Sequence, residues 1–167
     1  MRRPLVLLAV SLAAVAYAWT TRGGDDAPAK ALGGRVVQVT DGDTIRVALP
    51  GRVERVRYIG IDTPESVRPE TPVQCYAHRA AAENARLVAG RRVRLVLDVE
   101  TRDRFGRLLA YVYRAGDGVF INETLVRGGF ARTLTIPPNV RHAGRFAALA
   151  RQARRAGRGL WRACASA

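Results

Sequence analysis

Alternation of apolar and polar residues predicts β-structure in the first half of the domain. Runs rich in β-branched residues extend over 35–40 and 44–49, and Asp41-Gly42-Asp43 between them is typical of a hairpin turn. Pro50-Gly51 forms the next turn, and a third strand is expected over 53–61. Three successive strands of this kind predict an antiparallel meander.

The second half of the chain mixes helices with two further strands. Alanines recur at helical spacing after residue 76, and Gly90 ends the pattern. The expected elements are a helix over 76–89, strands over 93–97 and 108–113, a short helix over 121–127 and a last helix over 140–156 capped by Asn139. Five strands and three helices in this order favour an α+β fold dominated by a five-stranded OB-type barrel. Periodicity alone leaves other α+β arrangements open.

Residues 57–65 end the third strand and carry two carboxylates into a loop. Pro64 cannot donate to a β-ladder and biases Thr63 away from helical geometry, so the strand stops here. Asp62 and Glu65 therefore lie at the junction of a strand and a loop, where functional side chains often gather.

Arg57 stands out within this stretch because of its position in the alternation. An even number of residues separates it from Ile59 and Ile61, so a regular strand would place all three on one face. A buried arginine needs an anionic partner, and a substrate is one candidate.

The charge of the chain points to a polyanionic partner. The formal net charge is +14, the isoelectric point is near 11.4, and Lys30 is the only lysine. A G+C-rich genome that favours arginine codons is an alternative explanation for the ratio of arginine to lysine. It does not explain the net charge, which favours nucleic acid or an acidic membrane surface.

The N-terminal residues are typical of an export signal. Arg2 and Arg3 precede an apolar run over 4–19, and Ala16-Tyr17-Ala18 fits a small-x-small cleavage pattern. The run is shorter than the ~20 residues that span a bilayer comfortably, so we expect a cleaved signal peptide, with a retained membrane anchor as the alternative. The protein is then secreted or held outside the cytoplasmic membrane. The predicted divisions are a signal or anchor over 1–18, a flexible lead-in over 19–34, a domain over 35–162 and a tail over 163–167.

Two cysteines, Cys75 and Cys164, complete this picture. In an exported chain a single pair of cysteines is most simply a disulfide, which here ties the end of the chain to the middle of the domain. Two unpaired thiols are the alternative. With only two histidines to help, two distant sulfurs make a poor zinc site.

Acidic and basic side chains suggest phosphate chemistry. A meander brings Asp43 close to Asp62 and Glu65, and oxygen ligands without His or Cys select Ca²⁺ or Mg²⁺. Arg57 and Arg107 supply guanidinium groups, which bind phosphate oxygens in pairs and stabilise extra negative charge. Taken singly, Asp43 is also an ordinary turn residue and each arginine an ordinary surface residue.

Several motifs in a fixed order resemble the thermonuclease, or staphylococcal nuclease-like, family. Together they span most of the chain from Arg35 to Trp161. They are Asp41-Gly42-Asp43-Thr44, Arg57 followed by Asp62-Thr63-Pro64-Glu65, residues 103–111, Asn122-Glu123, Leu125-Val126 and Gly159-Leu160-Trp161.

The resemblance implies an OB-fold barrel that hydrolyses phosphodiester bonds in DNA and RNA with Ca²⁺ and typically leaves 3′-phosphates. Carried over by position, the metal ligands are the carboxylates of Asp43 and Asp62 and the backbone carbonyl of Thr63. Glu65 acts on the attacking water. Arg57 and Arg107 hold the phosphate, and Arg107 also assists the leaving oxygen. No protein partner is implied.

The chain departs from the family at one place. Its best-known member has two tyrosines after the second helix that pack on a base, whereas residues 133–137 contain none. Two rival functions fit the same basic charge. One is a non-catalytic OB module that binds nucleic acid, and the other is a basic protein that docks on anionic lipid through its last helix.

Overall fold

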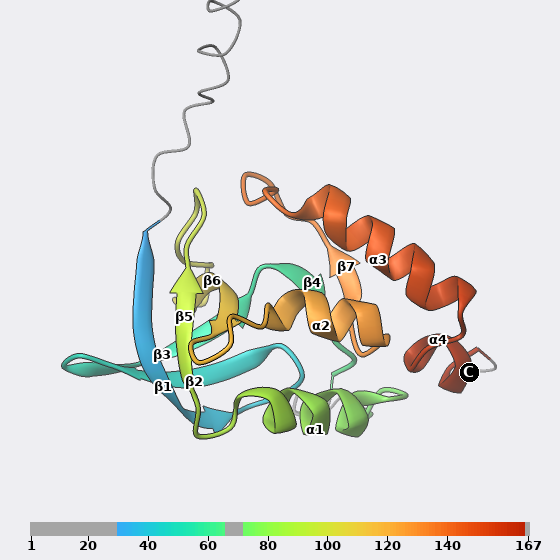
Figure 1. The fold of residues 1–167 in the computed structure, drawn as a ribbon, viewed down its shortest axis with the longest axis horizontal. Helices are drawn as coiled ribbons and strands as arrows, with labels where there is room; N and C mark the ends of the chain where they lie inside the picture. Colours follow the sequence, from blue (N-terminus) through green and yellow to red (C-terminus); the bar gives the residue numbers. More distant parts are fainter. Residues whose placement is uncertain (1–29, 66–71, 166–167) are drawn as a thin grey trace, which may run out of the picture.

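The computed structural model describes residues 30–65 and 72–165 (Figure 1). Five strands close into a barrel in the order β1-β2-β3-β6-β5, which confirms the predicted five-stranded barrel. The β3 and β6 strands pair in parallel, and the other pairs are antiparallel. The strands are β1 (Ala31–Val39), β2 (Thr44–Leu49), β3 (Arg52–Tyr58), β5 (Arg92–Val96) and β6 (Leu108–Arg114).

The barrel interior is filled by the apolar residues of the alternating pattern. On β2, Ile45 and Val47 are fully buried, and Val56 on β3 and Leu95 on β5 join the same core. Burial of each such side chain contributes roughly 1.5–3 kcal/mol.

Two helices close this core. These are α1 (Ala77–Val88) and α2 (Ile121–Gly128). Three residues of α2, Ile121, Leu125 and Val126, are fully buried, and Figure 1 shows this helix lying beside the barrel. Among the described residues, no helix has the length and apolar character needed to cross a bilayer.

The first strand begins earlier than the sequence predicts. Ala31 to Gly34 pair with β5, so the domain starts at Ala31 and not near Arg35. Polar and glycine-rich composition made these residues look like a linker. Gly34 lies in the strand opposite Val93. Glycine is needed at this position because a Cβ there would lie 2.5 Å from the side chain of Val47. The predicted segment 1–18 and residues 19–29 of the lead-in lie outside the described residues.

The predicted third strand over 53–61 is in fact broken. The β3 strand ends at Tyr58, and β4 (Gly60–Asp62) leaves the barrel to pair with β7 (Arg132–Leu134). Gly60 makes this break with φ at 79°, and a Cβ there would lie 2.7 Å from the ring of Phe146. The position therefore needs glycine for both its backbone and its contact.

The last predicted helix begins later than expected. The α3 helix runs over Ala143–Arg155 and starts after His142, not after Asn139. The side chain of Asn139 instead accepts a hydrogen bond from the N–H of Glu100 at 2.8 Å and donates one to its C=O at 2.7 Å. His142 packs on Tyr111, with ring centroids 4.5 Å apart.

The C-terminal end is tied to the domain. A short helix, α4 (Leu160–Ala163), buries Leu160, and the predicted disulfide between Cys75 and Cys164 is present. Of the predicted tail over 163–167, the structure describes Ala163 to Ala165, whose backbone N–H groups donate to α4 and the residue before it.

Candidate phosphodiester-cleaving site

Asp43 is the fixed point of the site. Its side chain is almost fully buried, at the turn that precedes β2. The N–H and hydroxyl of Thr63 donate to its Oδ2 at 2.8 and 3.0 Å, and the hydroxyl of Thr44 donates to its Oδ1 at 3.1 Å. Gly42 permits this approach because a Cβ there would lie 2.7 Å from the side chain of Thr63. Asp43 and Thr63, which are far apart in sequence, are thus held together.

Arg57 joins two of the predicted carboxylates. Its Nη2 lies 2.8 Å from Oδ1 of Asp62, and its Nη1 lies 3.2 Å from Oδ2 of Asp43. Nη1 also donates to the carbonyl of Ile61 at 2.8 Å. Only 12% of the Arg57 side chain is exposed, whereas 54% of the Asp62 side chain is, so the cluster meets water at Asp62.

The prediction that strand alternation places Arg57 on the same face as Ile59 and Ile61 is wrong. The chain bends between Tyr58 and Gly60, so strand alternation does not continue from Arg57 to Ile59 and Ile61. Arg57 is nevertheless largely buried, and its anionic partners are carboxylates of the protein itself.

Repulsion between carboxylates shapes the electrostatics. Burial, followed by the negative charge of Asp43 and more weakly that of Glu65, raises the pKa of Asp41 to about 6. Burial also raises the pKa of Asp62, against the opposing charge of Arg57, and the charges of Asp43 and Glu65 add to the rise. The cluster therefore holds more negative charge than Arg57 neutralises comfortably, and an added cation is favoured there.

Glu65 lies at the base of the loop that follows β4. Its N–H donates to Oε1 of Gln74 at 3.0 Å, and the N–H of Gln74 donates to the carbonyl of Glu65 at 3.0 Å. Cys75 directly follows Gln74, so the disulfide anchors the chain next to the residue that pairs with Glu65.

A groove of about 420 Å³ lies beside the cluster and contains both predicted arginines. The Nε of Arg107 donates to Oδ2 of Asp103 at 2.7 Å, which fixes the guanidinium. Among the described residues the two Nη groups of Arg107 have no hydrogen-bond partner. Asp43, Asp62 and Glu65 do not line the groove, and Asp43 and Asp62 reach it through their ion pairs with Arg57.

The rim of the groove is apolar where the family's tyrosines are missing. Leu134 and Ile136 line it and are 40% and 58% exposed, and Phe105, 62% exposed, lies on the same rim. The groove thus offers an aliphatic surface with one exposed aromatic ring.

The donors fit a hard divalent cation. Asp43 and Asp62 share a guanidinium, and the N–H of Thr63 donates to Asp43, so these three residues are close to one another. Oxygen donors of this kind suit Ca²⁺ or Mg²⁺. In residues 30–65 and 72–165, no three Asp, Glu, His or Cys side chains gather closely enough to hold an ion by themselves. Backbone oxygen or water has to complete the shell.

Three polar residues of the site were not predicted from the sequence. Asp41 belongs to the family motif but has no predicted role in the site, Asp103 has no predicted pairing with Arg107, and Asn84 has no predicted role. Asn84 accepts from the hydroxyl of Tyr58 at 2.9 Å and donates to the carbonyl of Asp41 at 2.8 Å, so it holds the turn before β2. A signal existed, because an asparagine on the buried face of a helix needs partners.

Comparison with known proteins matches this arrangement to one family. A family model described as "Staphylococcal nuclease homologue" matches residues 55–163. A thermonuclease from Staphylococcus hyicus is 40% identical over 127 residues, covering 76% of this chain and 74% of the relative. A thermonuclease from Staphylococcus intermedius is 48% identical over 104 residues, covering 62% and 61%. Endonuclease YncB from Bacillus subtilis is 42% identical over 108 residues, covering 64% of this chain and 50% of the relative. This chain thus spans less than two thirds of the last two relatives.

Proposed function

The chain belongs to the staphylococcal nuclease family, and on this premise we propose that it is an exported, calcium-dependent endonuclease acting on DNA and RNA. One observation carries the proposal. Arg57 contacts both Asp43 and Asp62 while it lines, with Arg107, a single groove. Acids that suit a metal and guanidinium groups that suit a phosphate are therefore within mutual reach.

Each residue has a defined role in the reaction. Arg57 and Arg107 bind the phosphate and stabilise the charge that grows on its oxygens. Glu65 accepts a proton from a water molecule whose oxygen forms a new bond to phosphorus. The bond from phosphorus to the 5′-oxygen breaks, and that oxygen takes up a proton, with Arg107 stabilising its charge. The products are a 3′-phosphate and a 5′-hydroxyl.

The carboxylates of Asp43 and Asp62 and the carbonyl of Thr63 would hold the calcium ion. When bound, the ion supplies Lewis-acid stabilisation of the phosphoryl oxygens. The chain prepares these donors without it, because Thr63 and Thr44 fix the orientation of Asp43 through three hydrogen bonds. Such a pre-set arrangement avoids the cost of reorganisation during the reaction.

A non-catalytic OB module is the rival function. Binding alone gains nothing from acids placed beside a phosphate groove, since they repel the ligand. After burial, the negative charges of Asp43 and Glu65 add to the rise in the pKa values of Asp41 and Asp62, so the chain keeps several carboxylates close together, and this supports catalysis over simple binding.

Export is supported by the apolar N-terminal sequence and by the disulfide between Cys75 and Cys164. Disulfides of this kind persist in oxidising compartments. A retained membrane anchor over 1–18 is the alternative to release.

The test compares wild type and Glu65→Gln on plasmid DNA and on RNA, with Ca²⁺ or with EGTA. We expect kcat to fall by about 10²–10⁴ in the variant, because a positioned base contributes that much. EGTA should abolish cleavage. Glu83→Gln is the matched control, since Glu83 pairs with Arg86 on α1 and lies outside the site. Equal cleavage by both variants, or cleavage that persists in EGTA, would refute the proposed mechanism.

A further inference from the structure

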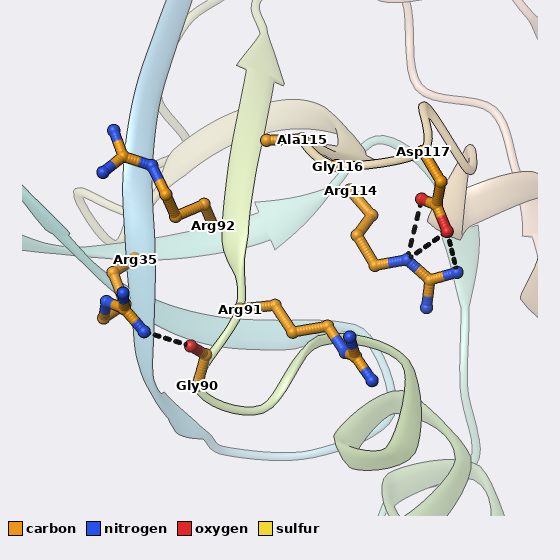
Figure 2. A pocket seen from close by; sticks show the side chains of 8 residues that line it. All are labelled: Arg35, Gly90, Arg91, Arg92, Arg114, Ala115, Gly116 and Asp117. Atoms are coloured by element: carbon orange, nitrogen blue, oxygen red, sulfur yellow. Dashed lines mark hydrogen bonds and ion pairs between the residues drawn. The ribbon is translucent and has the colours of Figure 1, made fainter.

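A second hollow, of about 520 Å³, shares no lining residue with the groove of the proposed site. Figure 2 shows it at the start of β5, between β1, the end of α1 and the turn that follows β6. Its lining residues are Arg35, Gly90, Arg91, Arg92, Arg114, Ala115, Gly116 and Asp117. We call it the arginine pocket.

The arginine pocket holds uncompensated positive charge. Arg114 is neutralised by Asp117, with Nε and Nη2 donating at 2.8 and 2.5 Å. Arg35 donates to the neutral carbonyl of Gly90 at 2.7 Å. Within the part of the chain that the structure describes, neither Arg91 nor Arg92 forms a salt bridge. Three guanidinium groups therefore lack a counter-ion.

The backbone register makes this charge costly. Arg35 on β1 lies directly opposite Arg92 on β5 in an antiparallel pair. Like charges at directly opposed positions destabilise a sheet. An anion bound at the pocket would remove this repulsion.

We propose that the arginine pocket binds the phosphodiester backbone of a nucleic-acid strand, as a second contact for the substrate of the proposed nuclease. The inference rests on the proposed function for its ligand. Figure 2 shows Arg35 and Arg92 on one side of the start of β5, and Arg91 and Arg114 on the other. Groups that point apart cannot enclose one phosphate, but they suit successive phosphates of a linear polyanion.

The rest of the lining defines the kind of recognition. Gly90, Ala115 and Gly116 are the uncharged residues, so the pocket has no aromatic ring on which a base stacks and no large apolar side chain to enter a membrane. Contacts to phosphate alone carry no sequence information. The pocket therefore adds affinity and processive contact without base preference, and it favours nucleic acid over lipid.

The chain offers a matched control for this charge. Arg46 on β2 and Arg55 on β3 are also directly opposed and exposed, but they line neither hollow. Arg35→Gln/Arg92→Gln and Arg46→Gln/Arg55→Gln thus remove the same charge from the same kind of cross-strand pair. Arg91→Gln is a further variant that disturbs no described hydrogen bond.

The experiment measures binding of the full chain to a fluorescent single-stranded oligonucleotide of mixed sequence in EGTA, over a range of salt. For Arg35→Gln/Arg92→Gln we expect the slope of log K against log salt to become shallower by about 1.4, since each phosphate contact contributes about 0.7. At physiological salt this corresponds to about tenfold weaker binding. Arg91→Gln should lower the slope by about 0.7, and Arg46→Gln/Arg55→Gln should leave it unchanged.

Three results would overturn the proposal. They are an unchanged slope in folded Arg35→Gln/Arg92→Gln and Arg91→Gln, equal losses in the control pair, or vesicles of anionic lipid that compete for the pocket with the same arginine dependence. Hydrolysis by wild type with Ca²⁺ is measured in parallel. Its absence would reject the proposed nuclease, while the binding comparison in EGTA still decides whether the pocket holds nucleic acid.

Discussion

The disulfide between Cys75 and Cys164 closes a loop of 89 residues in sequence separation. Removing it with Cys75→Ser/Cys164→Ser restores that loop's freedom to the unfolded chain. The chain-entropy relation gives a cost of about 4.6 kcal/mol for a loop of this length. At about 2–4 °C per kcal/mol, the melting temperature should fall by about 9–18 °C.

The assay is urea unfolding followed by circular dichroism, with thermal melts in parallel. Wild type treated with a reductant should match the double serine variant, and the reductant should not change the variant. A variant within about 1 kcal/mol of oxidised wild type would show that the unfolded chain gains little freedom when the bond is lost, and the entropic argument would fail.

The same bond also bears on the proposed site. Cys75 follows Gln74, whose backbone and side chain both bond to the backbone of Glu65. Local loosening of an anchored segment requires less free energy than global unfolding. In reduced protein, activity is therefore expected to fall at a lower temperature than the circular dichroism signal. Coincident loss of both would contradict this link.

Three further predictions concern packing, pH and binding. Gly60→Ala should lower the free energy of unfolding by about 2–5 kcal/mol, because alanine is strained at φ 79° and its Cβ meets the ring of Phe146. An unchanged midpoint of urea unfolding would contradict this. Burial, followed by the charges of Arg141 and Arg145, lowers the pKa of His142, so the unfolded state binds more protons and stability falls as pH drops from about 7 to about 5. His142→Gln should flatten that decline in urea titrations, and equal slopes would refute the assignment. Ile136→Tyr places an aromatic ring on the groove rim and should tighten binding of single-stranded DNA by about 1–3 kcal/mol. Fluorescence anisotropy in EGTA measures this binding. Val37→Tyr on β1, outside the groove, should leave it unchanged.

The barrel could be predicted from the sequence because its strands alternate in hydrophobicity. Ile45 and Val47, for example, face the core as the alternation of β2 requires. The break at Gly60 could not be predicted, because it depends on contact with Phe146, a residue distant in the sequence. Gly34 was misassigned for the same reason, since its close approach to Val47 is a tertiary contact.

The charged residues of the site were predictable from the sequence, but the residues that position them were not. The meander predicted that Asp43 lies close to Asp62, and in the structure both carboxylates pair with Arg57, a contact that was not predicted. The alternation of faces along a regular strand, however, gave the wrong reason for the burial of Arg57. Asn84 went unrecognised because its role depends on a hydrogen bond to the carbonyl of Asp41, which a pattern of side chains does not show.

Charge balance distinguishes the proposed site from the rest of this basic protein. Elsewhere buried acids have ample arginine partners, as Glu123 pairs with both Arg127 and Arg145. Glu54 likewise pairs with two arginines, Arg52 and Arg102.

At the proposed site the ratio of arginines to acids is reversed. Arg57 pairs with both Asp43 and Asp62, while Asp41 lies against Asp43 and has its pKa raised to about 6. A chain with a net charge of +14 has arginines enough to neutralise these acids, as it does elsewhere. A local excess of carboxylates with a single arginine partner lowers stability, and this excess sets the proposed site apart from the other acids described.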